Sequence, residues 1–286
     1  MFSHLFSSFQ PKKTGCRCRW APLFRIPLER RLQTAAVLVI ILIFPLTILS
    51  NLLLLFLWPV NTLYACYLLW FIIMDRETPQ RGGRAPIGRR WSLWKLFRNF
   101  FPSDLVVEGT LDPKNTHVFG IHPHGVIGMA VWANMMNNVN GALANIDYRI
   151  VTLKSNFYIP ITREWLLWLG AISSDKRGIT TTLKQGKSVV IVVGGAAEAL
   201  EIHREYHGIV LDKRKGFVEI AIKTGAHLVP VFNFGENELY HVATDNAIGT
   251  KVREWQEKMK DWFGFTLPVV HGRGIWNYSF VSRVPF

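Results

Sequence analysis

The chain has 286 residues, of which 49% are hydrophobic, and its 33 lysines and arginines outnumber its 20 acidic residues to give a formal net charge of +13. This length allows one sizeable core together with a membrane element. The charge predicts an anionic partner: nucleic acid, an acidic membrane surface or a phosphorylated substrate. A positive mean hydropathy and the lack of a zinc-finger or RNA-recognition motif favour the membrane and argue against nucleic acid. Three cysteines are too few for a disulfide framework, which predicts a reducing compartment.

Residues 35–74 contain no charged side chain. The run is about two bilayer crossings long at ~20 residues each. Arginines and lysines flank it on both sides, so the positive-inside rule places both ends in the cytoplasm. We therefore predict a cytosolic basic segment over residues 1–34 and a hydrophobic membrane hairpin over residues 35–74, with a single span as the alternative.

A polar linker rich in glycine, proline and arginine follows over residues 78–90. Large apolar side chains then recur with helical spacing at Trp91, Trp94, Phe97 and Phe101. This pattern predicts a helix that lies either in the headgroup region of a membrane or on the protein core. We assign residues 75–101 as a basic linker and interfacial helix, and residues 102–286 as a cytosolic domain.

Strand patterns alternate with helix patterns from residue 102 onward. Strands are predicted at 105–109, 118–121, 148–153, 189–193 and 228–234, and helices at 126–136, 163–169, 180–184, 216–224 and 251–263. Such alternation is typical of βαβ units, so we predict an α/β fold with a mainly parallel sheet flanked by helices. Pro230 cannot donate to a sheet ladder, which places the last predicted strand near an edge or at a bulge.

Two histidines follow the strand predicted at 118–121, in the sequence His122-Pro123-His124-Gly125. Histidine has an unperturbed pKa near neutrality and is the usual proton acceptor in catalysis. Two other predicted strands also end in polar residues. Because ligands bind outside the carboxyl ends of parallel strands, we expect these residues to share one rim. They are His122, His124, Glu198, Glu236 and Asn237.

A neutral histidine that removes a proton from an alcohol creates a nucleophile, and a carboxylate on its other nitrogen fixes the tautomer. This combination suits acyl transfer from an activated thioester to a hydroxyl. We assign His124 as the preferred base, because it lies nearer the next helix and Gly125 leaves room for substrate. His122 is the alternative base, or a hydrogen-bond donor to the thioester oxygen. Glu198 is the candidate acid.

The remaining candidates are assigned to substrate binding. Glu236 and Asn237 either bind acceptor hydroxyls or cap the segment that follows them. Basic residues before predicted helices lie where backbone amides and the helix dipole attract phosphate, with a solvated loop as the alternative for each. We therefore assign one set of residues to the acyl-CoA phosphates and to the substrate side of the rim: Gly125, Arg177, Gly194, Gly195, Arg214, Lys215 and Gly216.

Five sequence blocks in this order resemble the type 2 diacylglycerol acyltransferase family, which includes monoacylglycerol and wax-alcohol acyltransferases. The blocks are Phe100-Phe101-Pro102, His122-Pro123-His124-Gly125, Gly194-Gly195-Ala196-Ala197-Glu198, Arg214-Lys215-Gly216-Phe217, and residues 228–240. The resemblance runs from about Gln33 to the C-terminus. It implies a glycerolipid-acyltransferase-like fold in the endoplasmic reticulum membrane, with access to lipid droplets.

The resemblance also implies the reactants. Acyl-CoA is the donor, a neutral lipid alcohol such as diacylglycerol or monoacylglycerol is the acceptor, membrane lipid is a partner, and no metal or cofactor takes part. A homo-oligomer is compatible with the sequence. We predict formation of triacylglycerol, with a monoacylglycerol or fatty-alcohol (wax) acyltransferase as the alternative. The alternative outside the enzymes is an inactive, truncated protein that binds membranes or lipid droplets.

This sequence departs from the pattern of the wider glycerolipid acyltransferases, in which an aspartate lies five positions after the histidine. Those positions hold Ile127 and Met129, so the acid must come from elsewhere, which is the reason for choosing Glu198. Phe100 occupies a position where some members carry tyrosine. The chain ends at Phe286, whereas members usually continue with another strand and helix, so we expect a C-terminally shortened domain.

Overall fold

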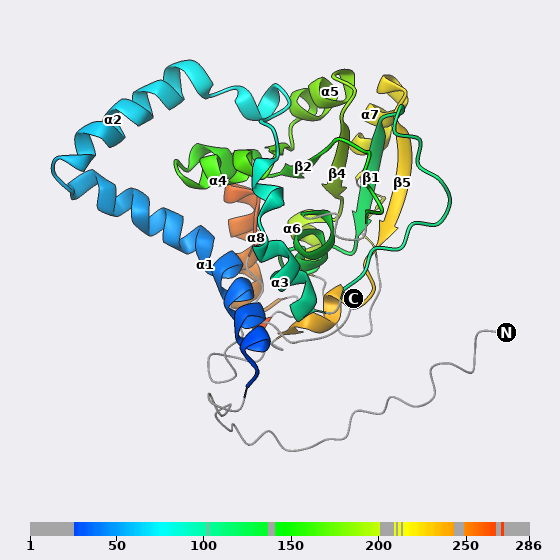
Figure 1. Ribbon diagram of the computed structural model, residues 1–286, viewed down its shortest axis with the longest axis horizontal. Helices are drawn as coiled ribbons and strands as arrows, with labels where there is room; N and C mark the ends of the chain where they lie inside the picture. The colour runs from blue at the N-terminus through cyan, green and yellow to red at the C-terminus, as the bar shows by residue number, and fades with distance from the viewer. Residues whose placement is uncertain are drawn as a thin grey trace.

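The computed structural model describes residues 26–101, 103–136, 141–200, 209, 211–212, 214–242, 249–266 and 270–271. Five parallel strands form one sheet in the order β3-β2-β4-β1-β5 (Figure 1), so the predicted α/β class and parallel sheet are confirmed. The strands are β1 (His117–His122), β2 (Tyr148–Thr152), β3 (Ala171–Ser173), β4 (Ser188–Val192) and β5 (His227–Phe232). A separate antiparallel pair joins β6 (His241–Val242) to β7 (Val270–His271).

The central strands β1 and β4 are runs of apolar residues that are buried on both sides of the sheet, as expected for a parallel sheet covered on two faces. Their register pairs Ile121 with Val192, so both strands end at the same level. β5 is the edge strand beyond β1, with Pro230 opposite Gly120. The edge position accommodates the missing N–H of Pro230, as the sequence predicted.

Alternate side chains of the strands enter two separate cores. One core contains Phe119 and Ile121 and is covered by α1 (Leu28–Phe56), α3 (Leu93–Phe100) and η5 (Val131–Met135). The other contains Val118 and Val189 and is covered by α5 (Lys176–Lys184) and α7 (Gly216–Thr224). The connection from β1 to β2 includes η5 in the first layer, and the connection from β4 to β5 includes α7 in the second layer. Open α/β sheets bind ligands where neighbouring strands connect in opposite directions like this, which here is between the ends of β1 and β4.

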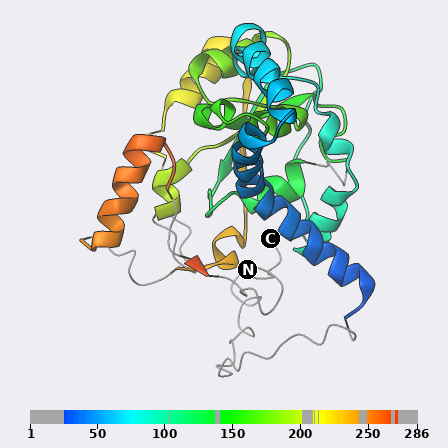
Figure 2. The same cartoon turned by 90° about the vertical axis from the view of Figure 1, so that its left-hand side faces the viewer.

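Among the described residues, α1 is the one helix with the length and hydropathy to cross a bilayer. After residues 57–59 the chain turns back into α2 (Val60–Trp70) and the π-helical turn η2 (Phe71–Asp75). Figure 2 shows α1 crossing in front of the sheet, with α2 above it. α1 starts at Leu28, within the segment predicted to precede the membrane element. Ala36, Val37 and Ile40 of α1 are buried in the core, so its first turns belong to the α/β domain.

Buried polar contacts attach these helices to the rest of the chain. The hydroxyls of Thr47 and Thr162 lie 2.6 Å apart, and Asn51 donates to the carbonyl oxygen of Pro160 at 2.9 Å. Arg163 is fully buried and forms ion pairs with Asp75 and with its neighbour Glu164. The position of α1 and α2 relative to the sheet is therefore fixed by specific partners as well as by apolar contact.

The amphipathic pattern predicted at 91–101 contains α3, and its apolar side chains from Trp94 onward lie inside the protein. Trp94, Phe97 and Phe101 have no exposed surface. The structure therefore agrees with the core alternative for these three residues, which are covered in the core that α1 and η5 share, whereas Trp91 is 39% exposed.

Two predicted elements differ from the structure. No strand forms at 105–109, where Val106 is 80% exposed, since an extended segment without a neighbouring strand has no ladder to join. The helix predicted at 126–136 is limited to η5. The short β3 and α6 (Gly195–Leu200) were not predicted. The other helices follow or nearly follow the predicted ranges: α4 (Thr162–Trp168), α5, α7 and α8 (Lys251–Phe263). Short helical turns occupy η3 (Thr78–Gln80), η4 (Ile87–Arg90), η6 (Lys154–Tyr158) and η7 (Glu236–Leu239).

Candidate active site

The carboxyl ends of β1 and β4 bring His122 and Glu198 together. His122 is the last residue of β1, and Glu198 lies in α6, just after the end of β4. The Nδ1 atom of His122 lies 3.8 Å from Oε1 of Glu198. Both atoms are buried, and neither has a hydrogen-bond partner within the described part of the chain. A movement of less than 1 Å would give these two groups the hydrogen bond that buried polar atoms require.

The second carboxylate oxygen of Glu198 holds the loop after β1. It accepts a hydrogen bond from the backbone N–H of His124 at 3.0 Å. Gly194 makes this approach feasible, because a Cβ atom at that position would lie 1.6 Å from Oε2 of Glu198. The glycine predicted to line the substrate therefore has a second use, which is to leave space for the Glu198 carboxylate.

The ring of His124 has a different partner. Its Nδ1 atom lies 2.9 Å from the carbonyl oxygen of Gly125, so a neutral ring carries its proton on Nδ1 and leaves Nε2 as the acceptor. Burial lowers the pKa of His124, which keeps the imidazole neutral near pH 7. The protein thus prepares His124 for proton acceptance. The Glu198 carboxylate lies within 4 Å of the ring of His122, whereas its hydrogen bond with His124 is to the backbone N–H.

Glu236, fully buried at the start of η7, caps the segment that follows the histidines. Its two carboxylate oxygens accept hydrogen bonds from the backbone N–H groups of Met129 at 2.9 Å and Ala130 at 2.8 Å. This cap lies on a segment more than 100 residues before Glu236, and not on the segment after it that was predicted from the sequence. The space beside Gly125 is filled by the same carboxylate, since a Cβ atom there would lie 2.3 Å from Oε1 of Glu236. Asn237 is buried next to it.

Burial raises the pKa of Glu236 to about 7, although its two backbone hydrogen bonds act in the opposite direction. An unfolded glutamate titrates near 4.5, so between these values the folded chain holds a proton that the unfolded chain has released. Stability from this group is therefore complete below pH 4.5 and is lost as the pH rises through 7, by an amount on the order of 3 kcal/mol.

We expect Glu236→Gln to flatten this pH dependence. The melting temperature of the detergent-solubilised parent, followed by tryptophan fluorescence, should fall by several degrees between pH 5 and pH 8. In the variant, the melting temperature should fall less over this pH range, because the glutamine amide does not titrate. Glu254→Gln, which removes an exposed carboxylate of α8, is the control and should keep the slope of the parent. An unchanged slope in Glu236→Gln would contradict the assignment.

The predicted phosphate-binding residues divide between two places. Arg214 is exposed, and its Nη2 atom lies 3.9 Å from the Cβ position of Gly195, which puts it beside the start of α6 and close to Glu198. Lys215 and Gly216 are exposed at the start of α7. Arg177 instead forms an exposed ion pair with Glu77 at 3.1 Å. Lys213 of the same basic run lies outside the described residues.

The rim predicted from the sequence is therefore present at the ends of β1, β4 and β5. Two features of the site were not predicted from the sequence. One is the space that Gly194 leaves for the Glu198 carboxylate; the Gly-Gly pair directly after a buried strand was the available signal, because glycine after a strand often marks a close approach of another group. The other is the contact of Glu236 with the loop, to which no local pattern pointed, since its partners lie more than 100 positions away.

Comparison with known proteins adds independent information. The sequence profile of a family described as diacylglycerol acyltransferase matches residues 51–286. The chain is 41% identical over 277 residues to diacylglycerol O-acyltransferase 2A of Umbelopsis ramanniana, which covers 92% of the chain and 75% of that protein. It is 37% identical over 275 residues to 2-acylglycerol O-acyltransferase 1 of Homo sapiens, and that alignment covers 92% of the chain and 81% of the human protein. No solved structure matches.

Proposed function

Because the chain belongs to the diacylglycerol acyltransferase family and is thus an acyl-CoA-dependent acylglycerol O-acyltransferase, we propose that it acylates diacylglycerol to form triacylglycerol. The observation that carries the chemistry is the 3.8 Å approach of the His122 ring to the Glu198 carboxylate. Acylation of monoacylglycerol is the second candidate, because relatives at 37–38% identity are named 2-acylglycerol O-acyltransferases.

In the proposed reaction, His122 is the general base. Glu198 accepts a hydrogen bond from Nδ1–H, which fixes the tautomer and leaves Nε2 free to take the proton of the acceptor hydroxyl. The hydroxyl oxygen attacks the thioester carbonyl, the new C–O bond forms, and the C–S bond breaks. The departing CoA thiolate receives the proton from the imidazolium. No covalent acyl-enzyme is required, because the thioester is already activated.

His124 remains the alternative base. Burial keeps its ring neutral, and its Nδ1 is already engaged by Gly125, so Nε2 could also accept a proton. It lacks a carboxylate at the ring, which would stabilise the positive charge that forms during proton transfer. For this reason we revise the preference expected from the sequence and assign the base to His122. Arg214 beside Gly195 is proposed to contact a phosphate of acyl-CoA.

The membrane assignment rests on the exposed apolar surface of α1 and α2. The side chains around the turn between the helices are the most exposed of them, with Phe56 83%, Trp58 80% and Leu63 72% exposed. Covering such a surface with lipid removes its contact with water. We propose that the two helices form a hairpin that enters the endoplasmic reticulum membrane, and the surface of lipid droplets, and returns to the cytosolic side. Neutral acceptors dissolved in the lipid would then reach the rim from the same side.

An acceptor panel tests this function. Membranes that contain the chain are given labelled acyl-CoA with diacylglycerol, monoacylglycerol or a fatty alcohol in separate reactions, with membranes that lack the chain as background. Labelled triacylglycerol formed from diacylglycerol is the expected product. Product from monoacylglycerol alone would favour the second candidate. No labelled product above background with any acceptor would overturn the proposal and favour a non-catalytic lipid-binding protein.

A further inference from the structure

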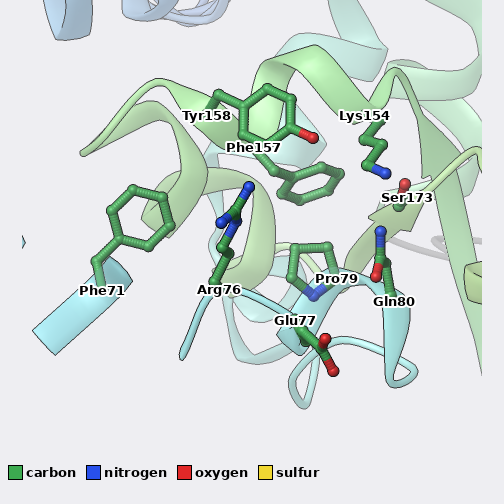
Figure 3. A pocket seen from close by; sticks show the side chains of 9 residues that line it. All are labelled: Phe71, Arg76, Glu77, Pro79, Gln80, Lys154, Phe157, Tyr158 and Ser173. Atoms are coloured by element: carbon green, nitrogen blue, oxygen red, sulfur yellow. The ribbon is translucent and has the colours of Figure 1, made fainter. Parts of the chain in front are cut away.

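A cavity of about 230 Å³ lies where the chain leaves η2 and enters the α/β domain. Its walls come from the first residue of η2, from the two residues that follow η2, from η3, from η6 and from the end of β3, as Figure 3 shows. Strands β2 and β4 separate β3 from β1 in the sheet, so the cavity is distinct from the rim that holds His122 and Glu198. The reaction proposed above does not use it.

The cavity has an apolar part and a cationic part. Phe71, Pro79 and Phe157 are buried and supply the apolar walls. Arg76 and Lys154 supply two cationic side chains, and Figure 3 shows the Arg76 guanidinium between the rings of Phe71 and Phe157. A ligand that fills this space therefore combines an anionic group with an apolar portion.

Among the described residues, the charges around the cavity leave the exposed side chain of Arg76 without an ion-pair partner. Lys154 lies 3.5 Å from Asp175, and Glu77 is shared by Arg81 and Arg177. No carboxylate of the described residues lies within 4 Å of Arg76. The cavity thus carries an excess positive charge on a side chain with five hydrogen-bond donors, which suits a phosphate group.

The cavity also borders the surface that would face lipid. Ile72, Ile73 and Met74, which directly precede Asp75 and Arg76, are 56%, 71% and 72% exposed. Cationic residues that follow an apolar membrane segment on the cytosolic side lie at the level of the phospholipid headgroups. A phosphate that reaches Arg76 can therefore belong to a lipid whose acyl chains lie along these three residues.

We propose that this cavity binds the headgroup of an anionic phospholipid of the surrounding membrane, with the phosphate at Arg76 and Lys154 and the glycerol end against Phe71 and Phe157. The inference rests on the proposed insertion of α1 and α2 into lipid, and it is independent of the proposed acyl transfer. Free phosphate and CoA carry the same chemical group, so the test must separate them from a lipid.

Native mass spectrometry of the detergent-solubilised full chain provides the test, with phosphatidic acid and phosphatidylcholine added in separate titrations. The parent should retain phosphatidic acid, and the double variant Arg76→Gln/Lys154→Gln should bind it about tenfold more weakly or worse, because charge-assisted hydrogen bonds are lost. The control Lys184→Gln/Lys187→Gln removes the same charge from the last residue of α5 and from the loop after it, neither of which lines the cavity, and it should bind like the parent. His122→Ala should also bind like the parent, which separates this site from catalysis.

Several outcomes would overturn the proposal. Equal weakening in both double variants would mean attraction by net charge alone. Displacement of phosphatidic acid by CoA or inorganic phosphate at similar concentrations would assign the cavity to a soluble ligand. Equal retention of phosphatidylcholine and phosphatidic acid would show that the cavity does not require an anionic headgroup.

Melting temperatures of both double variants within about 2 °C of the parent would exclude unfolding as the cause of weaker binding.

Discussion

Replacement of His122 by alanine is expected to reduce the turnover of acyl-CoA by a factor of about 10² to 10⁴ while the fold is retained. General base catalysis contributes rate factors of this size, and in the proposed reaction His122 alone accepts the proton of the acceptor hydroxyl. The side chain is 12% exposed and its Nδ1 atom has no partner within the described residues, so its removal leaves no broken hydrogen bond in the core. The rate is measured as labelled triacylglycerol formed per molecule of enzyme.

His227→Ala is the matched control for His122→Ala. His227 is exposed at the first residue of β5, whereas His122 is at the last residue of the neighbouring β1, so the same chemical change is made far from the rim. The control should keep the parent rate. His124→Ala gives the decisive comparison: a larger loss there, together with a nearly active His122→Ala, would transfer the role of base to His124.

Much of this site could be predicted from the sequence because its parts follow buried strands directly. The β-branched run of β4 and the apolar run of β1 identify strands covered on both faces, and parallel strands bring their carboxyl ends to one edge. His122 and Glu198 come at the ends of two such runs, so the sequence predicted their meeting on the condition that the two strands are neighbours. The strand order confirms that condition. Pro230 predicted an edge strand or a bulge at its position, and β5 is the edge strand.

The pairing of individual groups could not be predicted in the same way. The sequence favoured His124 as the base on account of the space beside Gly125, yet that space is occupied by the Glu236 carboxylate. Which of two histidines two positions apart meets Glu198 depends on the direction of the loop after β1. That direction is fixed by hydrogen bonds that backbone N–H groups of the loop donate to Glu198 and Glu236. Such long-range partners leave no periodic signal in the local sequence.

The burial of α3 shows a further limit. A helix with one apolar side has the same pattern whether that side meets lipid or core. Only the covering of Trp94 and Phe97 by neighbouring elements distinguishes the two. The same reasoning applies to α1, where Ala36 and Val37 enter the core while later turns expose their apolar side chains.

Glu198→Gln should lower the rate about as much as His122→Ala does, by a factor of about 10² to 10⁴. Glutamine keeps the size of the side chain, and its amide oxygen can still accept from the backbone N–H of His124. Its NH2 group would then face Nδ1 of His122 and donate a hydrogen bond where the carboxylate accepted one. That favours the tautomer with the proton on Nε2, which cannot accept the proton of the acceptor hydroxyl.

The double variant His122→Ala/Glu198→Gln separates a dyad from two independent residues. If Glu198 acts only through His122, the double variant should be no slower than His122→Ala, since residues that work as one unit have strongly non-additive effects. Losses that multiply would instead give Glu198 a role of its own, such as holding the loop through the backbone of His124. Glu254 is an exposed carboxylate of α8, and Glu254→Gln should leave the rate unchanged in the parent and in His122→Ala. This control shows that the effect of Glu198→Gln depends on where the negative charge is lost, and not on the loss of one charge.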